Sequence, residues 1–315
     1  MSSEFDLIAR IRSRAASRPD VVLGIGDDAA VIDVPEGRQL VVTTDTLNAG
    51  VHFPHATPVD AIGWKSLAVN LSDLAAMGAE PAWCTLSLSL PESSQPWLDA
   101  FLDGFLALAS RHSIALVGGD TTRGPLSITV TAMGVVAGAS ALRRDAARAG
   151  DEVWVTGTLG DASAALEAIL QGRDAPADLR ERLDRPTPRT AAGLSLLGLA
   201  HACVDVSDGL LADLGHICTR SAVGAEIELP LLPASSMLEV LDQAWRWRHQ
   251  ATGGDDYELC FTAPAGKRAA IEQAMRNAHT QATRIGRIVA GPGVRALDAG
   301  GHPWQASRDG YQHFA

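Results

Sequence analysis

Four apolar runs in this chain pass into glycine or threonine and then into aspartate. They end at Asp28, Asp45, Asp120 and Asp208, and Asp205 precedes the last of these acids. Apolar, β-branched runs bounded by glycine are typical of strands, and folds with sheets and helices bind ligands at strand ends, where backbone groups are free. A single glycine and aspartate after a strand are usually part of a turn or a helix cap. Four in one chain indicate an acidic site built on a sheet.

The order of predicted elements divides the 315 residues into two domains of ordinary size. Residues 1–138 mix strand pairs with crossover helices, which indicates an α+β domain with a mixed sheet. Residues 139–150 are small and charged and are predicted to form a linker before a second domain over 151–315. Predicted strands are 21–25, 29–34, 39–44, 82–90, 114–117, 126–136, 152–156, 202–206, 225–229 and 257–262. Predicted helices are 4–17, 60–77, 96–111, 161–170, 189–199 and 266–277, with one more between 206 and 225.

Charge and cysteine usage exclude several classes of protein. The net charge of −11 makes the chain as a whole repel nucleic acid and anionic membranes, so neither is an expected partner. No run approaches the ~18 consecutive apolar residues of a membrane span, and the first residues lack the apolar segment of a signal peptide. The four cysteines lie far apart, which argues against zinc and against a disulfide framework. A cytoplasmic protein is therefore expected.

The aspartates point to magnesium. Carboxylates gathered at one site repel one another and destabilise the fold unless cations neutralise them. Oxygen ligands without His or Cys suit Mg²⁺, which usually binds beside substrate phosphates. Thr43 and Thr44 add oxygen atoms next to Asp45. Asn70 and Asp73 share a face of a predicted helix, where Asp73 is either paired or metal-bound, or simply part of a solvent-facing polar edge.

Common nucleotide-binding motifs are missing. The chain has no G-x-x-x-x-G-K-[ST] loop and no protein-kinase H-R-D or D-F-G signature. A bound triphosphate would therefore depend on metal ions and on arginines such as Arg123, Arg143 and Arg144. The glycine turn at 157–161 joins a strand to a helix and is a weak candidate for a phosphate cradle.

The C-terminal part holds two further clusters. Residues 252–259 place three acids around Tyr257 just before a predicted strand, and residues 310–314 are rich in aromatic side chains. One interpretation is a lid of carboxylates and aromatics over a flat cationic ligand. The other is an ordinary packed terminus, because aromatic side chains are often simply buried.

Seven segments, taken in order, resemble the motifs of the thiamine-monophosphate kinases. The resemblance runs from about residue 4 to residue 314, and the segments 70–78 and 253–259 are the most specific. The matching segments are 24–28, 43–45, 70–78, 118–122, 205–210, 253–259 and 310–314.

This resemblance implies the two-domain architecture of the aminoimidazole ribonucleotide synthetase superfamily. An N-terminal α+β domain would bind ATP and magnesium and dimerise through its sheet, and a C-terminal α/β domain would complete the site. The implied reaction transfers the γ-phosphoryl group of ATP directly onto thiamine monophosphate, giving thiamine diphosphate and ADP in thiamine diphosphate biosynthesis. No catalytic nucleophile is expected, because the acceptor phosphate oxygen is already ionised and the reaction needs mainly alignment and charge neutralisation.

The resemblance also implies roles for individual residues. Several Mg²⁺ ions would be held by Asp28, Thr43, Thr44, Asp45, Asp73, Asp120, Asp205 and Asp208. ATP would contact Gly119, Asp120, Arg144 and Ser207, and thiamine monophosphate would face His52, Asp255 and Tyr311. The chain departs from the family pattern at Asp255 and Gln312, where Glu and Asp are common. Taken alone, His52 reads as an ordinary loop histidine.

Three other functions remain open on the sequence. A sister activity of the same superfamily is one, although selenophosphate synthesis would call for a reactive cysteine nearer the N-terminus than Cys84. A magnesium-dependent phosphohydrolase is the second, because clustered aspartates also serve two-metal hydrolysis. A sensor that binds ATP without turnover is the third.

Overall fold

The computed structural model describes residues 4–138, 140–305 and 310, and the chain falls into two compact units. Unit 1 holds the described residues up to Leu74 and those from Ala79 to residue 138. Unit 2 holds Ala75–Gly78 and the described residues from Ser140 onward. Within the described ranges, no helix combines the length and the apolar character needed to cross a membrane.

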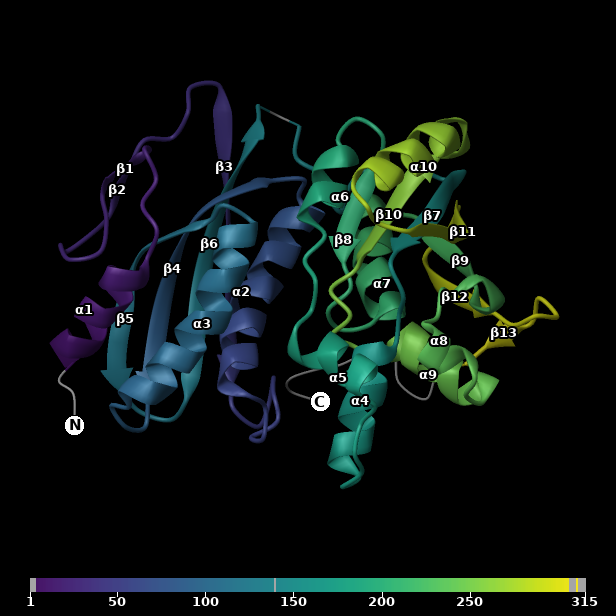
Figure 1. Cartoon of the computed structure of the whole chain (residues 1–315). Helices are drawn as coiled ribbons and strands as arrows, with labels where there is room; N and C mark the ends of the chain where they lie inside the picture. The colour runs from purple at the N-terminus through teal and green to yellow at the C-terminus, as the bar shows by residue number, and fades with distance from the viewer. Residues whose placement is uncertain (1–3, 139, 306–309, 311–315) are drawn as a thin grey trace. The chain divides into compact units, whose positions relative to one another are not determined.

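Unit 1 is built on a four-stranded sheet in the order β3-β6-β4-β5 (Figure 1). The strands are β3 (Arg38–Asn48), β4 (Glu80–Leu90), β5 (Ala115–Arg123) and β6 (Ser127–Ala137). β6 pairs antiparallel with β3 and β4, whereas β4 and β5 run parallel. A parallel pair requires a crossover, which helix α3 (Gln95–Arg111) supplies, while α2 (Val59–Ala76) connects β3 to β4. Helix α1 (Glu4–Arg14) and the short pair β1 (Val21–Leu23) and β2 (Val31–Ile32) precede this sheet.

Helices α2 and α3 approach until their backbones touch, and two glycines permit this. A Cβ atom on Gly104 of α3 would lie 1.7 Å from the carbonyl oxygen of Asp60, and one on Gly63 of α2 would lie 2.0 Å from that of Phe101. Both distances are far below van der Waals contact, so the crossing point requires glycine on each helix.

Unit 2 is built on a seven-stranded sheet in the order β13-β12-β9-β11-β7-β10-β8. Its strands are β7 (Asp151–Thr156), β8 (Ala202–Asp205), β9 (Gly224–Glu228), β10 (Leu259–Pro264), β11 (Ala282–Val289), β12 (Gly293–Leu297) and β13 (Pro303–Trp304). Its helices are α4 (Asp161–Leu170), α5 (Ala177–Asp184), α6 (Thr190–Ser195), α7 (Leu210–Ser221), α8 (Ser236–Glu239), α9 (Gln243–Thr252) and α10 (Arg268–Asn277), with 3₁₀ turns η1 (Leu229–Leu231) and η2 (Ala265–Lys267). The sheet is mixed, with β9 and β12 parallel and β10 antiparallel to both neighbours.

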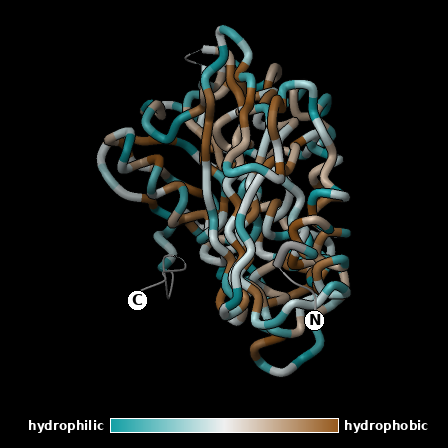
Figure 2. Tube along the Cα trace, turned by 90° about the vertical axis from the view of Figure 1, so that its left-hand side faces the viewer, coloured by the Kyte–Doolittle hydropathy of each residue, from teal (hydrophilic) through white to brown (hydrophobic). Residues whose placement is uncertain are grey.

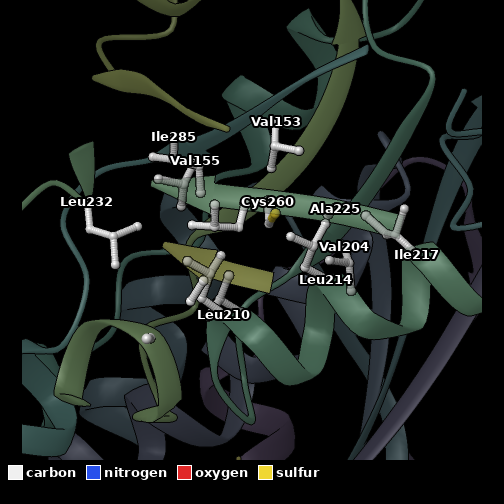
Figure 3. Close-up of a cluster of buried hydrophobic side chains, with 14 of the residues drawn as sticks. Val153, Val155, Val204, Leu210, Leu214, Ile217, Ala225, Leu232, Cys260 and Ile285 are labelled. Carbon is white, nitrogen blue, oxygen red and sulfur yellow. The ribbon is translucent and has the colours of Figure 1, made fainter. Parts of the chain in front are cut away.

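Side chains along the central strands point alternately to the two faces of this sheet, and each face has its own hydrophobic core. Val153 and Val155 point into one core, together with residues of α7, as Figure 3 shows. Trp154 between them points into the opposite core and stacks on Phe261, with ring centroids 6.3 Å apart. Successive strand residues face opposite sides, so β7, which is buried along its whole length, is covered on both faces. Figure 2 shows hydrophobic (brown) and hydrophilic (teal) stretches following one another along the chain.

The predicted fold class, two domains with mixed sheets and helices, is confirmed, and several element boundaries were wrong. The predicted strand at 114–117 continues to Arg123, because residues 118–123 pair in parallel register with β4. The helix predicted over 4–17 ends at Arg14. Helices α5, α8 and α9 and strands β11, β12 and β13 were not predicted. They are short or rich in polar residues, so their hydrophobic periodicity is faint.

Replacing Gly104 with alanine is expected to lower the melting temperature, because overpacking a tight contact costs about 1–3 kcal/mol. Gly215→Ala in α7 is the matched control: no neighbouring group lies within 4 Å of its Cβ position, and alanine favours a helix by about 1 kcal/mol. Thermal unfolding of both variants checks this. A Gly104→Ala protein that melts at or above wild type would contradict the backbone contact.

Candidate functional site

Three acidic side chains of unit 1 were predicted to lie at strand ends, and two of them lie within strands. Asp45 lies inside β3, which runs to Asn48, and Asp120 lies inside β5, opposite Ser87 of β4. Asp28 lies in the loop between β1 and β2, as expected. Threonine and glycine before an aspartate are typical of a turn, but here their backbones continue the ladder.

Asp45 and Asp73 form a close pair of carboxylates. Thr43 and Asp45 share one face of β3, because they are two residues apart on a strand, and the Thr43 hydroxyl donates to the Asp73 carboxylate on α2. Burial, and then the negative charge of Asp73, raise the pKa of Asp45 to about 6. The pair therefore favours either a proton or a metal cation between its oxygens.

Thr44 lies on the opposite face of β3. Its hydroxyl donates to the carbonyl oxygen of Val130 at 3.1 Å and lies 3.1 Å from the hydroxyl of Thr131. The side chains of Thr44 and Asp45 therefore do not share a face, and only the backbone of Thr44 is available on the side of Asp45.

A second group of predicted residues lines an open pocket of about 690 Å³ in unit 1. Asp28, Gly119 and Asp120 contribute to its wall, and α1 contributes the apolar side chains of Ile8 and Ile11. This volume falls within the range of about 300–1,000 Å³ that is typical of small-molecule sites. The pocket thus combines apolar surface with carboxylates, which suits an organic ligand that carries charge.

His52 lies in the loop after β3 with its ring orientation fixed by the backbone. Its Nδ1 atom accepts the N–H group of Asn48 at 2.9 Å. A neutral imidazole therefore carries its proton on Nε2. In that tautomer Nε2 is the hydrogen-bond donor of the ring.

In unit 2, Asp205 and the loop after it form a site around an acid that the sequence did not single out. Asp205 ends β8 and is 4% exposed. One carboxylate oxygen of Asp213 accepts the N–H groups of Ser207, Asp208 and Gly209 at 3.0, 3.0 and 3.1 Å. Burial, and then Asp208, raise the pKa of Asp213 to about 7. An acid in the first turn of a helix that follows glycine was the available signal.

The segment that carries Asp255 is bonded to this loop through the backbone. The N–H group of Asp255 donates to the carbonyl oxygen of Ser207 at 2.9 Å, and that of Tyr257 donates to Val206 at 2.8 Å. Unit 2 thus brings Asp205, Ser207, Asp208 and Asp255 together. Arg144 is exposed, and its carbonyl oxygen accepts the hydroxyl of Ser221 at 2.8 Å. Tyr311 lies outside the described residues.

The glycine turn at 157–161 does not present a free phosphate cradle. The N–H group of Gly160 donates to both carboxylate oxygens of Asp256 at 3.0 Å. The anion at this helix N-terminus is therefore supplied by the protein itself, and the phosphate-cradle interpretation was wrong for this group.

The donor chemistry fits magnesium, and Asp45 and Asp73 present it as a pair of carboxylates. In the part of the chain that the structure describes, no group of three or more His, Cys, Asp or Glu side chains converges as a metal site. The paired acids offer oxygen ligands, which Mg²⁺ prefers. Substrate phosphates commonly complete such a shell.

Comparison with known proteins gives a consistent result over nearly the whole chain. Residues 26–136 match AIR synthase related protein, N-terminal domain, and residues 148–298 match its C-terminal domain. A thiamine-monophosphate kinase of Escherichia coli O157:H7 is 47% identical over 99% of this chain and 98% of its own length. The crystal structure of thiamine-monophosphate kinase from Stenotrophomonas maltophilia K279a is 57% identical, with a TM-score of 0.87, over 93% of this chain and 96% of that chain.

A further solved structure, AaThiL complexed with AMPPCP and TMP, is 33% identical, with a TM-score of 0.78, over 98% of this chain and 96% of that chain. These matches agree with the seven motif segments found in the sequence. The chain therefore belongs to the thiamine-monophosphate kinase family of AIR synthase related proteins.

Proposed function

We infer that this protein transfers the γ-phosphoryl group of ATP to thiamine monophosphate, forming thiamine diphosphate and ADP. The observation that carries this inference is the likeness, over 98% of the chain, to AaThiL complexed with AMPPCP, an ATP analogue, and TMP. The 47% identity to a thiamine-monophosphate kinase over 99% of the chain supports the same activity.

The reaction needs no protein nucleophile. An ionised phosphate oxygen of thiamine monophosphate attacks the γ-phosphorus, and the bond from that phosphorus to the bridging oxygen of ADP breaks. Little covalent help is required, so the protein contributes positioning and charge stabilisation. Acids outnumber bases in this chain by 37 to 26, and the residues proposed at the site are mainly acids. Positive charge from outside the chain is therefore needed there.

We propose that several Mg²⁺ ions supply this charge, held by carboxylate and threonine oxygens. The ligands expected from the family motifs are Asp28, Thr43, Thr44, Asp45, Asp73, Asp120, Asp205 and Asp208. The raised pKa of Asp45 supports the proposal, because it reports a carboxylate that is unstable as an anion without a cation. When bound, Mg²⁺ would neutralise phosphate charge. The chain's own oxygens would fix where the ions and phosphates lie.

The proposed nucleotide contacts are Gly119, Asp120, Arg144 and Ser207, and the proposed substrate contacts are His52, Asp255 and Tyr311. The Nε2–H group of His52 suits a phosphate oxygen, since Nδ1 already accepts from Asn48. The carboxylate of Asp255 suits the cationic thiazolium ring. We assign nucleotide and metal binding mainly to residues 1–138, with 139–150 as a linker and 151–315 completing the site.

We also propose a homodimer formed through the sheet of unit 1. β3 is an edge strand, and Leu40 and Val42 on its outer face are 45% and 55% exposed. An exposed apolar edge is a natural pairing surface. A cytoplasmic location stays a prediction of the sequence. The four cysteines are free thiols, which agrees with a reducing compartment.

The activity is tested by incubating the protein with ATP, Mg²⁺ and thiamine monophosphate and separating the products by chromatography. We expect thiamine diphosphate and ADP in equal amounts. Asp45→Asn should lower the rate by at least about 100-fold, as expected when charge stabilisation in the transition state is lost. ADP formed without thiamine diphosphate would indicate a phosphohydrolase. Nucleotide binding without ADP release would indicate a sensor.

Asp45 predicts a distinctive pH dependence for the metal-free protein. Its pKa rises from 3.8 to about 6 on folding, so the folded state binds more protons between these values and stability falls as pH rises through them. In EDTA at pH 8, Asp45→Asn should have a higher melting temperature than wild type. Its free energy of unfolding should be larger by up to about 3 kcal/mol, at ~1.4 kcal/mol per pKa unit. At pH 4 the difference should be small.

Asp174→Asn, which changes an exposed acid of unit 2, is the control and should change the melting temperature little at either pH. Excess Mg²⁺ with ATP should then stabilise wild type more than Asp45→Asn. A variant that melts no higher than wild type at pH 8 in EDTA would show that the Asp45 carboxylate is not destabilised.

The dimer is tested by placing a charge on the outer face of β3. Wild type is expected to sediment as a particle of twice 33.0 kDa, and Val42→Glu should shift it toward the monomer. Val240→Glu, at an 80% exposed position in unit 2, is the matched control and should leave the mass unchanged. A wild-type monomer, or a Val42→Glu dimer of unchanged strength, would argue against this interface.

A further inference from the structure

The segment at 253–258, between α9 and β10, has an unusual backbone. Asp255 and Tyr257 have φ angles of +69° and +50°, in the left-handed region that side chains rarely adopt. Such conformations persist only when the surroundings hold them, and they cluster at functional sites. Two left-handed residues separated by only one residue indicate that contacts with the surrounding structure hold this segment in place.

Asp256 and Glu258 point inward and anchor the segment. Asp256 is 2% exposed, and both its carboxylate oxygens accept from Gly160. Glu258 is fully buried, and it binds Arg189 through two hydrogen bonds of 2.6 Å and Arg182 through one of 2.7 Å. Charge-assisted pairs of this kind are among the strongest in proteins. The inward side chains therefore hold the backbone rigid.

Tyr257 and Asp255 are the other pair of the same segment. The Tyr257 hydroxyl donates to the Oδ1 atom of Asp255 at 3.1 Å, although the tyrosine itself is only 8% exposed. Asp255 is partly exposed, and its N–H group is held by Ser207. The hydroxyl of a largely buried tyrosine thus orients a carboxylate that solvent and ligands can reach. A fixed carboxylate loses less rotational freedom when a ligand binds than a free one does.

We propose that Tyr257 is a positioning residue for substrate binding, whose hydroxyl holds the Asp255 carboxylate in the orientation that receives the cationic part of thiamine monophosphate. This proposal rests on the function proposed above, in which Asp255 contacts that substrate. Tyr257 acts through Asp255 and does not itself touch the reacting phosphates. The phenol oxygen of Tyr257 alone carries this role.

Tyr257→Phe removes that oxygen and leaves the ring, so it separates positioning from packing. A hydrogen bond to a charged group is worth about a tenfold change in an equilibrium constant. We therefore expect KM for thiamine monophosphate to rise about tenfold. KM for ATP and kcat should stay within about twofold, and the melting temperature should be near that of wild type.

A double-mutant cycle with Asp255→Asn tests whether the tyrosine acts through the acid. Asp255→Asn alone should also raise KM for thiamine monophosphate. Adding Tyr257→Phe to it should then have little further effect, because the oriented carboxylate is already gone. Calorimetric titration of thiamine monophosphate into each variant with AMPPCP and Mg²⁺ should show the same pattern in Kd.

Two results would overturn the proposal while leaving the activity intact. In the first, Tyr257→Phe phosphorylates thiamine monophosphate with unchanged KM. In the second, KM for both substrates, kcat and melting temperature shift together and the two substitutions are additive, which would assign Tyr257 to packing. If wild type forms no thiamine diphosphate at all, the proposed function fails first and this proposal fails with it.

Discussion

The acidic residues of this protein fall into two physical classes, and the difference between them organises the site. Buried acids of unit 2 are neutralised from within: Glu258 by two arginines, Asp256 by the N–H group of Gly160, and Asp213 by three N–H groups. Asp45 is different, because burial and the acid Asp73 both raise its pKa, and no N–H group or arginine among the described residues lowers it. Such a pair is stable only with added positive charge, which a magnesium nucleotide complex would bring.

The acids that the protein neutralises itself hold in place the loops that carry the acids proposed to bind ligands. Asp213 fixes the loop of Ser207 and Asp208, and Asp256 fixes the segment that carries Asp255. The two loops are in turn joined by the hydrogen bond from Asp255 to Ser207. Ser207, Asp208 and Asp255 are therefore parts of one connected piece of backbone. Preorganisation of this kind is what phosphoryl transfer demands of a protein.

The sequence predicts the two-domain fold and the acids proposed as ligands, because glycine, threonine and aspartate at the ends of apolar runs form a pattern that is visible in the sequence. It does not predict the supports. Arg182 and Arg189 are far from Glu258 in the chain, and the role of Gly160 depends on which acid reaches its N–H group. The sequence also misplaces Asp45 and Asp120, since a turn-like composition can continue a ladder when the neighbouring strand supplies the partners. Tertiary pairing, which sequence patterns do not encode, decided each of these points.

The central claim is that Asp45, Asp73, Asp205 and Asp208 bind metal together with the nucleotide. The most direct measurement is anomalous diffraction from crystals grown with Mn²⁺ in place of Mg²⁺, AMPPCP and thiamine monophosphate. The account predicts anomalous peaks at Asp45 and Asp73 and at Asp205 and Asp208, each also contacting phosphate oxygens. Nucleotide bound with no metal peak beside any of these carboxylates would contradict it.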